Sequence, residues 1–191
     1  MRLFIATTFP AHVLSGVSDV VARVKTRLPP SSWVRPESQH LTFAFLGEQD
    51  EAILPRIGEL VEAKLADVRP FEAQLRGCGF FPNSRNARVA WVGVNPEEQF
   101  RDTATAVRAA VAVAGIKLDG SDFKAHLTLC RLRDQWPPAC VEIYQKTFGT
   151  FESSRFTVDH VTLYSSQLNP KGAIHTPLRE FSLARAVVAK S

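Results

Sequence analysis

The stretch HLTFAFLG, residues 40–47, opens with a four-residue motif that returns as HLTL at residues 126–129. The two histidines are 126 − 40 = 86 positions apart, close to half of the 191 residues. Each copy follows a polar segment and lies in a run of branched and aromatic residues, which is typical of a β-strand. A repeat with one motif in each half predicts two related, intertwined lobes within a single domain, residues 1–191.

The motif suits acid–base chemistry because successive side chains of a strand point to opposite faces. His40 and Thr42 are therefore expected on one face of their strand, and His126 and Thr128 on one face of theirs. Two such strands facing each other across a cleft would present two imidazoles and two hydroxyls. Imidazoles can transfer protons near neutral pH, and hydroxyls can stabilise charge on phosphate oxygens. The set predicts opening of a phosphodiester by an acid and a base on opposite sides of phosphorus.

The remaining patterns mix strands and helices without regular βαβ alternation, which predicts an α+β fold with antiparallel sheets. Strands are predicted over residues 2–8, 32–35, 40–46, 71–81, 88–94, 123–132, 155–165 and 174–183. Helices are predicted where apolar residues recur at helical spacing, over residues 13–24, 53–65 and 97–114. Residues 133–150 are ambiguous, with a loop expected at Pro137-Pro138.

The composition is that of a globular protein, with 45% hydrophobic and 22% charged residues. The net charge of +4 and the pI of about 9.2 fit an anionic substrate such as RNA. The three cysteines, Cys78, Cys130 and Cys140, are odd in number and widely spaced, which indicates free thiols in a reducing cytoplasm. No apolar stretch reaches the length of a membrane span, and no carboxylate cluster suggests a metal site.

The motifs and their surroundings resemble the two-histidine (2H) phosphoesterase superfamily. They are most similar to its RNA 2′,3′-cyclic phosphodiesterases of the LigT/ThpR type, also called 2′-5′ RNA ligases. Five segments carry the resemblance, in the order of the family and over nearly the whole chain. They are RLFIATTFP (2–10), WVRPESQHLTFAFLGE (33–48), RVAWVGV (88–94), DFKAHLTLCRLR (122–133) and VTLYSSQLNPKGAIHTPLREFSL (161–183).

The resemblance implies a LigT-like fold of two pseudo-symmetric lobes, each an antiparallel sheet backed by helices, with the active-site cleft between them. It implies hydrolysis of RNA 2′,3′-cyclic ends to 2′-phosphates, without metal or cofactor, in RNA processing. In family terms, His40 is the proton donor and His126 the proton acceptor, while Thr42 and Thr128 bind the phosphate. Some members also join RNA ends through 2′-5′ linkages without ATP. The expected partner is RNA or a nucleotide with a cyclic end, including tRNA fragments, and the expected state is a cytoplasmic monomer away from membranes.

Further residues are assigned less directly. Arg131 matches a family arginine after the second motif, and it is expected to contact phosphate or to stack on a base. Phe45 is expected on the core face of its strand, with base stacking as the alternative. Lys124-Ala125 replaces a common Arg-Pro or His-Pro, with Lys124 expected as a charge at the rim of the cleft. Ala44 stands on the predicted cleft face, where many members have a cation.

The remaining histidines are expected outside the catalytic set. His160-Val161-Thr162-Leu163 is a third match to the bare pattern, so the pattern alone is weak, and His160 is interpreted as structural or surface-exposed. His12 and His175 are expected in solvent, with a place beside the cleft as the alternative for His175.

Two other classes of function remain open. One is an enzyme of the same superfamily that grips a longer chain, such as an RNA 3′-end exonuclease or a 2′-5′ oligoadenylate hydrolase. The other is a non-catalytic module that binds RNA or nucleotides. The intact pair of histidines and threonines argues against the second class.

Overall fold

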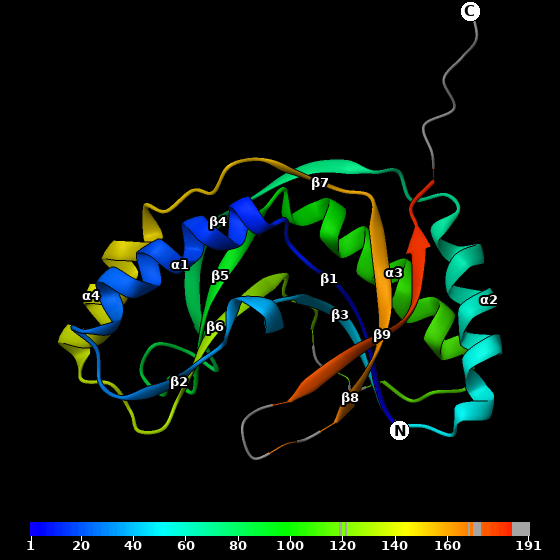
Figure 1. Cartoon of the computed structure of the whole chain (residues 1–191), viewed down its shortest axis with the longest axis horizontal. Coiled ribbons are helices and arrows are strands. Elements are labelled where there is room, and N and C mark those ends of the chain that lie inside the picture. Colours follow the sequence, from blue (N-terminus) through cyan, green and yellow to red (C-terminus); the bar gives the residue numbers. More distant parts are fainter. Residues whose placement is uncertain (119, 121, 168, 170–172, 185–191) are drawn as a thin grey trace, which may run out of the picture.

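The computed structural model describes residues 1–118, 120, 122–167, 169 and 173–184. Its strands form two antiparallel sheets, one in the order β3-β1-β8-β9 and one in the order β2-β6-β5-β4-β7 (Figure 1). The strands are β1 (Arg2–Thr7), β2 (Ser31–Trp33), β3 (Leu41–Glu48), β4 (Phe71–Phe81), β5 (Val89–Asn95), β6 (His126–Leu132), β7 (Phe156–Val158), β8 (His160–Gln167) and β9 (Ile174–Ser182). The helices are α1 (Ala11–Lys25), α2 (Leu54–Leu65), α3 (Glu97–Val113) and α4 (Pro138–Gly149), with short 3-10 helices η1 (Pro36–Ser38) and η2 (Glu51–Ile53).

Each sheet is backed by a pair of helices (Figure 1). Helices α2 and α3 pack on each other and on β9 and β3, whereas α4 packs on β4 and contacts α1. The helices form because their apolar residues recur on one face. In α1, for example, Val13, Val17, Val20 and Val24 are buried.

The chain crosses between the two sheets more than once. Strand β1 lies in the four-stranded sheet, but α1 follows it and packs with α4 on the other side. Helix α3 likewise follows β5 of the five-stranded sheet and packs on β3 of the other. Each sheet is therefore completed by segments from both halves of the chain, and each contains one of the two repeated motifs.

The predicted α+β class with antiparallel sheets is confirmed, and most elements lie within two or three residues of their predicted bounds. The ambiguous segment contains α4, which begins directly after Pro137. Proline is tolerated there because the first turn of a helix has no partner for its N–H groups. The predicted strand from residue 123 begins only at His126, and His40 lies one residue before β3.

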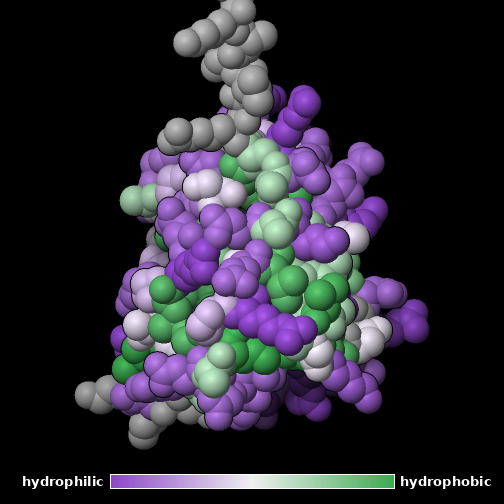
Figure 2. Space-filling model, turned by 90° about the vertical axis from the view of Figure 1, so that its right-hand side faces the viewer, coloured by the Kyte–Doolittle hydropathy of each residue, from purple (hydrophilic) through white to green (hydrophobic). Residues whose placement is uncertain are grey.

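The buried apolar residues form one continuous cluster that extends through both sheets. On the side that α2 presents to solvent, hydrophilic side chains dominate and surround a band of apolar ones (Figure 2). All three cysteines are free, as predicted. Within the described ranges, no helix combines the length and apolar character that a membrane crossing requires.

Candidate active site

The two motif histidines lie where the sheets meet. His40 directly precedes β3 and His126 is the first residue of β6, and these strands contact each other although they belong to different sheets. The two imidazoles are near enough for a charge on His126 to lower the pKa of His40. The tertiary structure therefore brings together two residues that are 86 positions apart in the sequence.

Both imidazoles are oriented by the same backbone contact. Nδ1 of His40 lies 2.8 Å from the carbonyl oxygen of Ser38, and Nδ1 of His126 lies 2.7 Å from the carbonyl oxygen of Lys124. A carbonyl oxygen only accepts, so each Nδ1 must carry the hydrogen. In the neutral ring, Nε2 is then an unprotonated acceptor that is free to exchange a proton with a substrate. The second contact repeats the first, 86 residues later.

Aromatic side chains hold the two rings. The ring of His40 lies 4.9 Å from that of Phe4, between centroids, and 5.1 Å from that of His175 in a T-shaped arrangement. The ring of His126 lies 4.8 Å from that of Phe81 and 6.1 Å from that of Trp91. These aromatic neighbours exclude water from much of each imidazole but leave its Nε2 without a partner among the described residues.

Burial lowers the pKa of both histidines. For His40 it lowers the pKa to about 4, and the charges of His175, His126 and Arg131 act in the same direction. For His126 burial is again the largest cause, followed among the charges by Arg131 and Lys124. The bond to each backbone carbonyl opposes the shift because the charged ring donates a stronger hydrogen bond from Nδ1 than the neutral ring does. Both rings are therefore neutral at pH 7 in the free protein.

The two motif threonines are partly buried residues of β3 and β6. Neither Thr42 nor Thr128 forms a side-chain hydrogen bond within the described residues. Each stands two positions after its histidine, which puts it on the histidine's face of the strand. Their hydroxyls are available as donors to a bound anion.

A β-bulge in the first motif strand changes which residues share the face of His40. Ile5 pairs with Ala44 but Ala6 pairs with Thr42, so Phe43 has no partner in β1. An extra residue of this kind reverses the alternation of side chains beyond it. Phe45 is in consequence 61% exposed, and the expectation that it packs in the core is wrong. Ala44 is buried at 1% exposure, so its expected place on the cleft face is also wrong.

The second motif strand contains the same bulge. Ala90 pairs with Cys130 but Trp91 pairs with Thr128, which leaves Leu129 without a partner. The reversal brings the exposed Arg131 to the face of His126. Its charge lowers the pKa of His126 and of His40, so it lies within electrostatic reach of both rings.

Three further residues lie near the histidines, and His175 takes the alternative place beside the pair that its sequence interpretation left open. His175 lies against His40 and Phe4, and its buried Nδ1 has no hydrogen-bond partner among the described residues. Lys124 is engaged, since its ammonium lies 3.0 Å from both carboxylate oxygens of Glu97. Trp91 was not singled out, yet its indole N–H is buried without a partner beside His126. His175 is placed by the pairing of β9 with β8, and Trp91 by the pairing of β5 with β6, so both positions depend on tertiary structure.

The other histidines lie away from this pair. His160 interacts with Asp159, whose carboxylate oxygen is 2.6 Å from its Nδ1, and His12 is exposed on α1. In the described part of the chain, no three His, Cys, Asp or Glu side chains form a group that could hold a metal ion.

Comparison with known proteins gives a consistent picture. The sequence model of the 2′-5′ RNA ligase superfamily matches residues 16–170. A protein of Archaeoglobus fulgidus named RNA 2′,3′-cyclic phosphodiesterase is 36% identical, over 95% of this chain and 99% of the relative. A protein of the same name from Thermus thermophilus is also 36% identical, over 96% of this chain and 90% of the relative.

Solved structures agree with the sequence comparison. The crystal structure of the Thermus thermophilus protein TT0787 superposes with a TM-score of 0.79 at 30% identity, over 97% of this chain and 100% of that one. Escherichia coli LigT in complex with 3′-AMP gives a TM-score of 0.74 at 25% identity, over 96% and 98% of the two chains. The chain thus belongs to the 2′-5′ RNA ligase superfamily, whose members are two-histidine phosphoesterases.

Proposed function

We propose that this enzyme opens the 2′,3′-cyclic phosphate at an RNA end and leaves a 2′-phosphate, without a metal ion, with His40 and His126 as the proton-transfer groups. One observation carries the proposal. Two histidines from different sheets lie within electrostatic reach, each with Nδ1 bound to a backbone carbonyl and Nε2 free. The names of the relatives, RNA 2′,3′-cyclic phosphodiesterase, support the same substrate class.

The reaction requires one proton acceptor and one proton donor. Nε2 of His126 accepts a proton from water as the water oxygen forms a bond to phosphorus. The bond from phosphorus to the 3′ oxygen breaks on the opposite side, and His40 gives its Nε2 proton to that oxygen. The product carries a 2′-phosphate and a 3′-hydroxyl, and solvent then restores the two protonation states.

The donor must be protonated although the pKa of His40 is about 4 in the free protein. A bound phosphate anion next to the ring stabilises the charged form and raises this pKa. The enzyme therefore gains its acid together with its substrate. The same anion raises the pKa of His126 less if the water molecule stands between them.

Thr42, Thr128 and Arg131 are assigned to the phosphate. Their hydroxyls and guanidinium would donate to the two non-bridging oxygens, where negative charge grows in the transition state. Phe45, exposed on the face of His40, is assigned to stacking on the base that carries the cyclic phosphate. Joining RNA ends would be the same ring opening with a 5′-hydroxyl in the place of water, so that a bond from phosphorus to the 5′ oxygen forms, the bond to the 3′ oxygen breaks and a 2′-5′ linkage remains.

We further propose that residues 1–191 act as one domain and as a monomer, because one chain supplies both histidines. The proposed location is the cytoplasm, which fits three free cysteines. RNA fragments with cyclic ends, including those of tRNA, are the proposed partners. The alternatives make different predictions. An exonuclease or an oligoadenylate hydrolase would require a longer oligonucleotide as its substrate, whereas a binding module would bind RNA without converting it.

The test is incubation of a 2′,3′-cyclic mononucleotide with the protein in EDTA, followed by identification of the product. A 2′-phosphate is expected, with loss of at least about 100-fold in kcat for His40→Ala and for His126→Ala. His12→Ala, on the exposed face of α1, is the matched control and should retain full activity. A 3′-phosphate product, dependence on a divalent metal, or undiminished activity in both variants would refute the proposal.

A further inference from the structure

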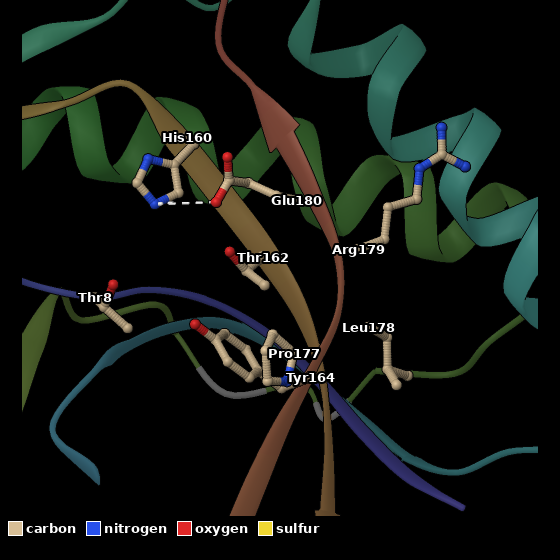
Figure 3. Close-up of a pocket in the computed structure, with 8 residues that line it drawn as sticks. All are labelled: Thr8, His160, Thr162, Tyr164, Pro177, Leu178, Arg179 and Glu180. Atoms are coloured by element: carbon tan, nitrogen blue, oxygen red, sulfur yellow. Dashed lines mark ion pairs between the residues drawn. The ribbon is translucent and has the colours of Figure 1, made fainter. Parts of the chain in front are cut away.

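A pocket of about 340 Å³ opens on the four-stranded sheet, over β8 and β9 (Figure 3). It is lined by Thr8, His160, Thr162, Tyr164, Pro177 and Glu180, among others. The volume lies within the range of small-molecule sites. The third His-x-Thr pattern of the sequence thus borders a cavity of its own.

The pocket is lined by a hydroxyl that has no hydrogen-bond partner among the described residues. Thr162 is only 5% exposed, yet its hydroxyl forms no hydrogen bond within the described residues. Its neighbours in β8, Val161 and Leu163, are buried in the core on the opposite face. Figure 3 shows the Thr162 side chain between those of His160 and Tyr164, toward the cavity. A hydroxyl at the wall of a cavity with no partner among the described residues is available to donate to, and to accept from, a bound molecule.

Aromatic contacts connect the pocket to the proposed catalytic pair. The ring of Tyr164 stacks on that of Phe4, with centroids 5.2 Å apart and planes at 14°. Phe4 in turn lies against His40. Thr162 precedes Tyr164 by two residues in β8, which places it about 7 Å further along the strand from the Phe4 contact. The pocket is therefore adjacent to the site of the cyclic phosphate but too distant to hold that group itself.

The charges around the pocket disfavour a phosphate. Glu180 pairs with Thr162 in the hairpin, and Asp159 lies beside His160. Among the lining residues that the structure describes, the one arginine, Arg179, points away toward α2, where it pairs with Glu62 (Figure 3). Carboxylates repel an anion but accept hydrogen bonds from amino groups and hydroxyls. The chemistry fits the base and ribose of a nucleoside, with Tyr164 as an aromatic platform.

We infer that this pocket binds the nucleoside directly 5′ of the nucleotide that carries the cyclic phosphate. The assignment rests on the proposed function and adds a second subsite to it. Thr162 and Glu180 contact this upstream nucleoside. The phosphodiester that links it to the terminal nucleotide then passes over Phe4 and Tyr164, which lie between the two sites. The enzyme in consequence prefers a dinucleotide or longer RNA end over a mononucleotide.

The experiment compares kcat/KM for a cyclic mononucleotide and for a dinucleotide that ends in the same cyclic nucleotide. Thr162→Val and Glu180→Gln should each lower the dinucleotide value by about three- to tenfold, the effect of one hydrogen bond. Both should leave the mononucleotide value within about twofold of the parent. Glu180→Gln alters a largely exposed side chain, so it remains informative if Thr162→Val impairs folding.

Two controls make the result specific. Glu142→Gln removes an equally exposed carboxylate, on α4, and should not distinguish the substrates. A dinucleotide without its upstream base should lower kcat/KM in the parent and give no additional loss in the two pocket variants. Equal losses on both substrates, or no effect of the missing base, would overturn the assignment while the catalytic proposal stands. A parent that opens neither substrate would overturn the catalytic proposal, and this assignment with it.

Discussion

Phe45 and Arg131 occupy equivalent positions in the two motif strands, each exposed on the face of its motif histidine. Their separation, 131 − 45 = 86, equals that of the two histidines. Each follows a bulge that leaves one residue unpaired, Phe43 in β3 and Leu129 in β6. On one face, the duplicated strand therefore presents a histidine, a threonine and a further side chain beyond the bulge. That last side chain is an aromatic ring in one copy and a guanidinium in the other.

Arg131→Gln should lower activity and move its pH dependence. The charge of Arg131 lowers the pKa of both histidines, so its removal shifts both limbs of the kcat/KM profile to higher pH. Loss of a contact to the phosphate should also lower kcat/KM by about 10- to 100-fold. Arg133→Gln, at an exposed position two residues on, is the control. An unchanged profile for Arg131→Gln would place its guanidinium away from the reaction.

Phe45→Ala should raise KM and leave stability nearly unchanged, because the ring is 61% exposed. Stacking on a base contributes about 1–3 kcal/mol, which corresponds to a KM increase of about 5- to 150-fold. Phe43→Ala should do the opposite and lower the free energy of unfolding by about 3–5 kcal/mol, since that ring is 1% exposed. Urea denaturation and steady-state kinetics on both variants would check the pair. A large stability loss in Phe45→Ala would contradict its assigned role.

The pH optimum of kcat/KM should lie below 6.5, the ordinary pKa of histidine. Burial lowers the pKa of both histidines, so with the proposed roles the free enzyme holds its acid only in mildly acidic solution. The profile of kcat, which reports the bound complex, should have its alkaline limb at higher pH, because the phosphate anion raises the pKa of His40. Initial rates from about pH 4 to about pH 9 would test both profiles. An alkaline optimum of kcat/KM would be incompatible with His40 as the acid.

The free protein should lose stability as the pH falls from 6.5 toward 4. In this window the unfolded chain binds a proton at residue 40 and the folded one does not, since its pKa is about 4. The loss attributable to this group is about 3 kcal/mol and is complete below about pH 4. Urea denaturation at several pH values should show a shallower decline for His40→Gln. An identical decline in the variant would mean that the imidazole is not buried in solution.

Gly79→Ala should reduce activity by displacing a ring that supports His126. A Cβ atom at residue 79 would overlap the ring of Trp91, which must then move. Trp91 neighbours His126, so kcat should fall even though the substitution is outside the site. Gly16→Ala meets nothing within 4 Å and serves as the control. It should keep full activity and raise stability by about 0.5–1 kcal/mol, because alanine favours the helix.

Local sequence patterns determined a large part of this protein. The spacing of valines in α1 and the branched and aromatic residues of the strands predict their elements, because helices and strands bury apolar residues with different periods. The repeat of His-Leu-Thr indicates the proposed catalytic pair for a related, chemical reason. Proton transfer at phosphorus requires two groups of suitable pKa, and few side chains have one.

Only the tertiary structure decided which other side chains join that pair. Strand alternation misplaces Phe45 and Ala44, because a bulge depends on the partner strand and leaves no local signal. The positions of His175 and Trp91 likewise follow from the pairing of β8 with β9 and of β5 with β6. The type of each residue determines what it can do as an acid, base or donor, whereas pairing between distant strands sets which residues share a face, and burial then sets their pKa.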